Sequence, residues 1–204
     1  MKYLPFLFCL FVLISCSEKP AATETTSEEV VTPTDAAVIE NKDGQYADVP
    51  ANAAKEEFTD TPGVVKVSVG TDAQGTYKDG KRNGSWIEYH PNGLVKTITS
   101  YVDGKKEGLY AELTNNGQLQ KRMYYHNNLR HGEYKEYNYS TVKEDRTYQF
   151  DKLEGTVKIF YDNGKVMEEG NYKNGTRDGI SKWYDKEGNP TITYEYKNGE
   201  LVKK

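Results

Sequence analysis

The chain has 204 residues, enough for one or two domains, and a formal net charge of −4. The charge is uneven: residues 17–60 hold 11 acidic and 3 basic side chains, whereas residues 61–204 hold 20 acidic and 23 basic ones. A face that binds nucleic acid needs more clustered Lys and Arg than this nearly neutral second part contains. The composition therefore predicts no nucleic-acid partner.

The N-terminal residues 1–16 have the features of an export signal. A positive start at Lys2 precedes an apolar run over residues 3–14, which is too short to span a bilayer as a helix of about 20 residues and fits a secretory signal. Residues 13–16, Leu-Ile-Ser-Cys, resemble a bacterial lipobox, in which cleavage precedes a cysteine that carries diacylglycerol. The alternative is an ordinary signal peptide with an incidental cysteine.

The lipobox resemblance implies a lipid anchor on Cys16 that holds the protein at a membrane surface without spanning it. It places the protein in the cell envelope, with the outer membrane as the expected membrane. Residues 17–60, rich in Ala, Thr, Glu and Pro, predict a disordered acidic tether, because they offer too little apolar area to offset chain entropy. Within it, Asp48–Phe58 could form one or two helical turns.

The rest of the chain, residues 61–204, is a repeat domain. After a strand-like alternating stretch at 63–69, an aromatic residue opens each copy of one pattern, at Tyr77, Tyr101, Tyr125, Phe150, Tyr172 and Tyr196. The spacings are 24, 24, 25, 22 and 24 residues, which is typical of a repeat architecture.

Each copy contains two turn signals and therefore predicts two strands. Dipeptides such as Asp103-Gly104 accept the positive φ angles of a two-residue hairpin, and Asn116-Gly117 marks a second turn. A further glycine, Gly108 in the second copy, predicts a bulge or a close backbone approach. Neither face of the expected strands is purely apolar. The predicted fold is all-β: a single elongated, twisted antiparallel meander of β-hairpins in one layer.

The pattern Y-x-[DN]-G-x-x-x-G-x-[WY]-x-x-[YF], followed by N-G, resembles MORN repeats, and more closely the bacterial MORN-variant family often described as antitoxin-like. The resemblance runs from Tyr77 to about Val202 and departs at Phe150 and over residues 139–146. It implies a β-hairpin meander that binds or scaffolds protein partners without catalysis. The predicted function is a non-catalytic envelope lipoprotein that displays the sheet for protein or ligand binding. The alternative is an antitoxin or immunity protein that neutralises a partner toxin.

Candidate chemistry is sparse. Cys9 would leave with the signal and Cys16 would be lipidated, so no thiol remains for catalysis or metal binding. His126 and His131 lie five residues apart with no third ligand at a recognisable spacing. We expect no metal, no cofactor and no enzymatic activity. The equivalent residues Glu88, Glu112 and Glu136 could form a carboxylate ladder about 9–10 Å apart, and the lysines that could pair with them are Lys96, Lys121 and Lys143.

Four aromatic residues are the candidate partner-binding side chains. Trp86, Tyr110, Tyr134 and Trp183 could form a strip of exposed rings that binds a protein partner or a glycan. The alternative is that these rings form an internal ladder that holds the sheet together.

Overall fold

The computed structural model describes residue 49 and residues 52–203. In this part of the chain every regular element is a strand. The first eight strands are β1 (Ala54–Glu57), β2 (Val64–Val69), β3 (Ala73–Lys78), β4 (Lys81–Tyr89), β5 (Val95–Val102), β6 (Lys105–Leu113), β7 (Leu119–His126) and β8 (Leu129–Asn138). The others are β9 (Thr141–Gln149), β10 (Lys152–Leu153), β11 (Gly155–Phe160), β12 (Val166–Lys173), β13 (Thr176–Tyr184), β14 (Pro190–Lys197) and β15 (Glu200–Lys203).

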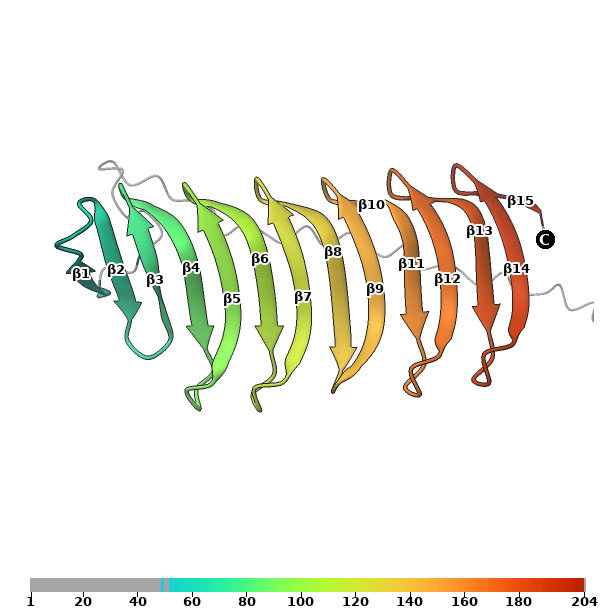
Figure 1. Ribbon diagram of the computed structural model, residues 1–204, viewed down its shortest axis with the longest axis horizontal. Helices are drawn as coiled ribbons and strands as arrows, with labels where there is room; N and C mark the ends of the chain where they lie inside the picture. The colour runs from blue at the N-terminus through green and yellow to red at the C-terminus, as the bar shows by residue number, and fades with distance from the viewer. Residues whose placement is uncertain (1–48, 50–51, 204) are drawn as a thin grey trace, which may run out of the picture. The chain divides into compact units, whose positions relative to one another are not determined.

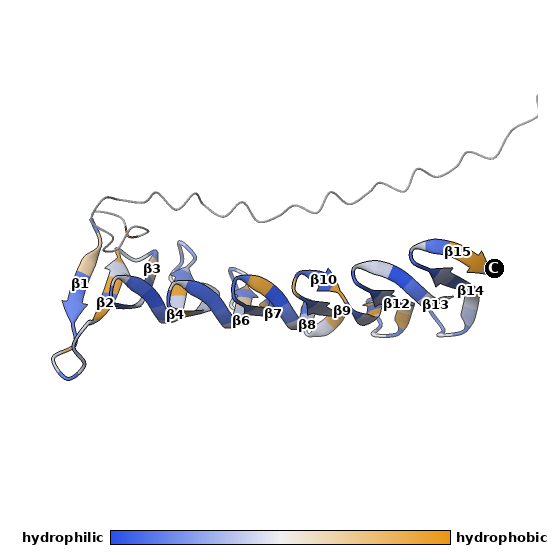
Figure 2. Ribbon diagram, turned by 90° about the horizontal axis from the view of Figure 1, so that it is seen from above, coloured by the Kyte–Doolittle hydropathy of each residue, from blue (hydrophilic) through white to orange (hydrophobic). Residues whose placement is uncertain are grey.

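The strands form one open antiparallel sheet in which neighbours follow chain order, and β10 pairs with β9 beside that path. Figure 1 shows the meander from β1 to β15, and Figure 2 shows the strands in a single row. The predicted all-β, single-layer meander is confirmed. Among the described residues, no helix is long and apolar enough to cross a membrane.

The short turns connect each copy to the one before it. Both residues of the Asp103-Gly104 turn have positive φ, at 49° and 82°, as a two-residue hairpin with matching strand twist requires. The Gly104 N–H then donates to the carbonyl of Arg82 in the preceding copy at 2.8 Å. The same bond recurs at 2.8–3.0 Å in the next four short turns, from Asn128, Asp151, Gly175 and Gly199.

The second glycine of each copy marks a bulge, as predicted. Between β3 and β4, Gly75 pairs with Trp86 and Tyr77 pairs with Arg82. The step from one pair to the next is therefore two residues on β3 but four residues on β4. Gly84 takes up the extra length with φ +90°. A side chain at such a position is strained, which explains why glycine recurs there.

The fourth copy starts at Tyr148, two residues before the Phe150 that the spacing predicts. Tyr148 pairs with Leu153 in the way that Tyr125 pairs with Arg130. Phe150 and Asp151 are instead the two turn residues, with φ +49° and +65°. The misplacement arises because both positions are aromatic and the turn lacks glycine. No residues are missing before Gly155; β10 and β11 together fill the place of one strand.

The segment 139–146, which the sequence marks as irregular, forms a regular hairpin. Asn138 pairs with Thr141 across a two-residue turn in which Tyr139 has φ +54°. The other copies use longer turns, such as the one closed by the His90 N–H to the Leu94 carbonyl at 2.8 Å. The shorter turn makes the third copy one residue shorter than its neighbours.

Side chains pack mainly on one side of the sheet, called here the aromatic face because it carries the copy-opening tyrosines; the other side is the opposite face. One buried cluster on the aromatic face contains Val65, Val67, Tyr77 and Trp86. A second contains Met123, Tyr134 and Tyr148. In a single layer, cross-strand contacts of this kind replace a core between two layers.

The sheet begins inside the stretch predicted to be a tether. β1 pairs with β2, for example Lys55 with Val67, so a strand stands at Ala54–Glu57, inside the segment Asp48–Phe58 where helical turns were expected. The export signal, Cys16 and most of the predicted tether lie outside the described residues.

Candidate functional site

A cation five residues after the opening aromatic connects the rings of adjacent copies. The Arg82 guanidinium lies 4.3 Å from the centroid of the Trp86 ring. Its nitrogens donate to the hydroxyl of Tyr77 at 3.1 Å and to that of Tyr101 at 3.2 Å. A guanidinium stacked on a ring gains a cation–π attraction while its N–H groups remain available for hydrogen bonds. Arg82 therefore bridges the first two copies.

The same position holds a cation in most copies. Lys106 lies 5.3 Å from the ring of Tyr125, and Arg130 lies 4.3 Å from that of Tyr148. Arg177 contacts three rings at 5.3–5.6 Å, those of Tyr172, Trp183 and Tyr196. The sequence interpretation missed these cations, although the periodic Arg or Lys at this position was a usable signal.

The fourth copy has Leu153 at the cation position. An additional cation, Arg146 on β9, lies 5.5 Å from the ring of Tyr134 in the third copy. Arg146 also forms an ion pair with Glu144 and donates to the Tyr148 hydroxyl at 3.5 Å. A cation therefore contacts the ring that opens the fourth copy, although the fourth copy has an apolar residue at its own cation position.

Trp86 is a structural residue of the first buried cluster. Its side chain is 5% exposed, and its ring meets Tyr77 edge to face at 5.8 Å between centroids. Val49 and Ala53 pack against the same cluster. A ring covered in this way offers little surface to a partner.

Tyr110 and Tyr134 occupy the equivalent position in the next two copies. Tyr134 is 8% exposed and donates its hydroxyl to Glu136 at 2.9 Å; half-buried Tyr110 donates to Glu112 at 3.3 Å. Burial and the adjacent carboxylate raise the pKa of both hydroxyls. These two rings also belong to the internal ladder.

Trp183 lies on the same face but one row nearer the long turns. Its cross-strand partners are Glu168 and Ile192, whereas Ser181 takes the position of Trp86. Its ring meets Tyr194 at 5.5 Å, and Tyr194 meets Tyr196 at 6.3 Å. Trp183, Ile192, Tyr194 and Tyr196 are called the Trp183 patch below.

The Trp183 patch differs in chemistry from the same row in earlier copies. That row holds Glu88 and Thr97 in the first copy and Glu112 and Lys121 in the second, but Trp183 and Ile192 in the fifth. Ile192 is 43% exposed and Trp183 is half-buried. Polar residues fill this row in the first three copies, and Ile159 occupies it between Glu144 and Glu168 in the fourth. The sheet therefore requires no apolar pair here, and the Trp183 patch is the strongest candidate for partner binding.

The carboxylate ladder is largely neutralised. Glu112 pairs with Lys121 at 3.7 Å and Glu136 with Lys143 at 3.1 Å, as two of the predicted pairs require. Glu88 accepts instead from the Thr97 hydroxyl at 2.9 Å. Within residues 52–203, no group of three or more His, Cys, Asp and Glu side chains is placed to hold a metal ion.

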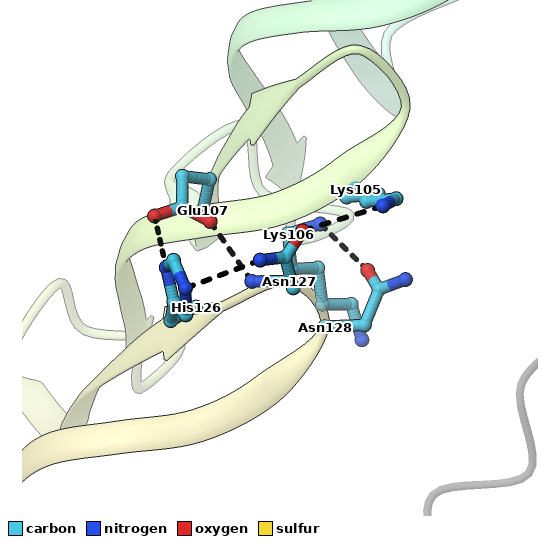
Figure 3. Close-up of polar contacts among 6 residues, drawn as sticks. All are labelled: Lys105, Lys106, Glu107, His126, Asn127 and Asn128. Carbon is cyan, nitrogen blue, oxygen red and sulfur yellow. Dashed lines mark hydrogen bonds and ion pairs between the residues drawn. The ribbon is translucent and has the colours of Figure 1, made fainter. Parts of the chain in front are cut away.

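The polar side chains around His126, at the edge of the sheet formed by the short turns, stabilise one of these turns. Figure 3 shows Glu107 accepting the Asn127 N–H at 2.8 Å and contacting His126 Nδ1 at 2.9 Å, while Asn128 accepts the Lys106 N–H at 2.7 Å. The hydrogen bond from the Asn127 N–H, and to a smaller extent the one from His126, hold the pKa of Glu107 below its usual value. His131 lies 5.8 Å from His126 between ring centroids.

The family described as MORN repeat variant matches residues 82–103, 153–174 and 177–198. Each match begins at the cation position and ends at the first residue of the next short turn, which agrees with the structural register that starts the fourth copy at Tyr148. MORN repeats suggest a binding or scaffolding role and are generally non-catalytic. A search of curated proteins found no match to the chain.

Proposed function

We propose that this chain is a non-catalytic binding module, held at the cell envelope by lipid on Cys16, that contacts a protein partner through the Trp183 patch. The observation that carries the proposal is the change of one row from polar side chains in the first three copies to the apolar pair of Trp183 and Ile192 in the fifth. Partly exposed Trp and Tyr beside an exposed apolar side chain are among the residues that supply most of the binding energy at protein interfaces.

The ring geometry supports a protein partner over a glycan. Sugar stacking requires a flat, open ring face. The planes of Trp183 and Tyr194 are inclined at 62°, and those of Tyr194 and Tyr196 at 69°. Arg177 also contacts the rings of Trp183 and Tyr196. The remaining surface is a ridged apolar patch, which fits aliphatic or aromatic side chains better than a pyranose ring.

Photo-crosslinking in intact cells tests the patch. Benzoylphenylalanine at Ile192 should capture a defined envelope protein. The matched control is Thr193, the next residue of β14, which is exposed on the opposite face. Equal capture from both positions would contradict the assignment, and so would a protein-free crosslink at Ile192 combined with glycan-array binding.

Metabolic palmitate labelling tests the anchor separately. The wild-type chain should incorporate label and fractionate with the envelope, whereas Cys16→Ser should do neither. Label retained in Cys16→Ser would remove the lipoprotein part of the proposal without affecting the binding patch.

A further inference from the structure

An apolar strip runs along the long-turn end of the opposite face. A large side chain lies at the end of four strands and one residue before the end of a fifth: Tyr89 on β4, Leu113 on β6, Phe160 on β11 and Tyr184 on β13, and Tyr137 on β8. All five are half-buried. The hydrogen bonding of Tyr89 shows on which face this residue lies. Its hydroxyl accepts from the side-chain amide of Gln74 on the opposite face at 2.5 Å, and the other four residues occupy the equivalent position.

Smaller apolar residues fill the positions between them. The cross-strand partner of each large residue lies on the next strand, just past a bulge at which two residues of that strand oppose one, so the bulge returns the partner to the face of the large residue. These partners are Val95, Leu119, Val142, Val166 and Pro190. Along the strip, an aromatic ring therefore alternates with Val or Pro at four of the five pairs, whereas the fifth pair joins two leucines, Leu113 and Leu119; the first member of each pair recurs about every 9.6 Å.

This alternation is complementary to itself. A twofold rotation about an axis parallel to the strands, between β8 and β9, reverses the order of the ten positions and turns large into smaller. Tyr137 of one copy then faces Val142 of the second copy, and Phe160 faces Leu119. An odd number of strands would have placed large against large, whereas an isologous interface requires the match found here.

The neighbouring row of the opposite face adds charge complementarity at the axis. Lys135 and Asp145 form an ion pair within one chain at 3.4 Å, and the same rotation places this pair against its own copy in the opposite order, Lys135 against Asp145 twice. Arg122 would face Lys158, each with a carboxylate partner of its own, Glu133 and Glu169. The strip and this row provide two side chains per strand over ten strands, close to the roughly 20–30 residues per side of a standard interface.

We propose that two copies of this chain pack face to face through the apolar strip, as an isologous dimer about the β8–β9 axis. Two single-layer sheets then become a two-layer sandwich with about 10 Å between layers. The aromatic faces, with their Trp183 patches, point outward and stay available, so the dimer does not depend on the proposed partner binding.

Single-cysteine crosslinking tests the axis in the full chain with Cys9 and Cys16 replaced by Ser. Val142→Cys lies next to the axis and should form at least tenfold more covalent dimer with a short bismaleimide crosslinker, which can reach across the two layers where a disulfide cannot, than Ile192→Cys. Ile192 is the fair control because it is more exposed but lies on the other face. Equal dimer from the two variants would overturn the proposal.

Sedimentation velocity provides the second test. The chain should sediment at twice the monomer mass, and Tyr137→Asp should raise the dimer dissociation constant at least tenfold with an unchanged circular dichroism spectrum. Should Tyr137→Asp unfold, Pro190→Asp at the exposed end of the strip replaces it. A chain that stays monomeric up to 100 µM, or a dimer that neither aspartate weakens, would overturn the proposal.

Discussion

Gly75→Ala tests the contact on which the first buried cluster depends. A Cβ at residue 75 would lie 2.3 Å from Cε3 of Trp86 and 3.0 Å from the Ser85 carbonyl oxygen. Trp86 is buried and has Arg82 over its ring, so it has little room to move. Overpacking of this kind costs about 1–3 kcal/mol. At about 2–4 °C per kcal/mol, the melting temperature should fall by several degrees.

The magnitude becomes specific in a double-mutant cycle. Removing the indole with Trp86→Leu removes the 2.3 Å contact but leaves the 3.0 Å contact to the Ser85 carbonyl oxygen, so adding Gly75→Ala to that background should cost less than it does beside Trp86. Alanine in place of glycine also reduces the entropy of the unfolded chain, which stabilises by about 0.4–1 kcal/mol and offsets part of the remaining contact. The expected coupling energy is about 1–3 kcal/mol.

Urea unfolding measures the cycle, and hydrogen exchange localises it. In a repeat sheet each copy contacts only its neighbours, so faster exchange should be confined to β2–β5, and β12 and β13 serve as an internal control. If Gly75→Ala cost the same with Trp86 present and absent, the close approach of the indole to the backbone could not be the reason for glycine at this position.

Three further experiments, with five substitutions, separate structural from functional positions. Gly108→Val, at φ +89°, should lower the melting temperature more than Lys106→Ala does; equal shifts would contradict the strain argument. Glu107→Gln should make the free energy of unfolding, measured by urea titration at a series of pH values, depend less on pH in the acid range. Because folding lowers the pKa of Glu107, the stabilisation by its carboxylate is present above the ordinary pKa of about 4.5 and is lost as pH falls through the lower folded value. A pH dependence unchanged by Glu107→Gln would refute this. Trp86→Ala should cost about 3–5 kcal/mol of stability, whereas Trp183→Ala should mainly abolish partner crosslinking; the reverse pattern would exchange their roles.

The fold was predictable from the turns. Dipeptides such as Asp103-Gly104 specify the hairpins, because their positive φ angles suit few other residues. Where the turn residues are atypical the prediction failed locally: Phe150-Asp151 forms the same turn without glycine, so the fourth copy was placed two residues late. Tyr139-Ser140 likewise closes a regular hairpin that its composition did not indicate.

The candidate site was less predictable, because the sequence specifies which face a ring lies on but not how much of it is covered. Trp86 and Trp183 are the same residue type on one face, yet one is enclosed by Tyr77 and Arg82 and the other borders exposed Ile192. The apolar strip on the opposite face could not be predicted from the sequence for another reason. A bulge between Glu88 and Tyr89 changes the alternation, so Val95 pairs with Tyr89 although its spacing from Thr97 suggests the aromatic face.

The stacking of the copies side by side in one sheet also determines how the sheet responds to a pulling force. The strands run across the direction in which the copies are stacked, so a pull on the two ends of the sheet loads the ladder bonds of one edge hairpin at a time. Each released copy of about 24 residues lengthens the chain by about 80 Å when fully extended. A chain pulled between a membrane anchor and a bound partner would therefore extend in discrete steps, and the length of a step would be set by the repeat.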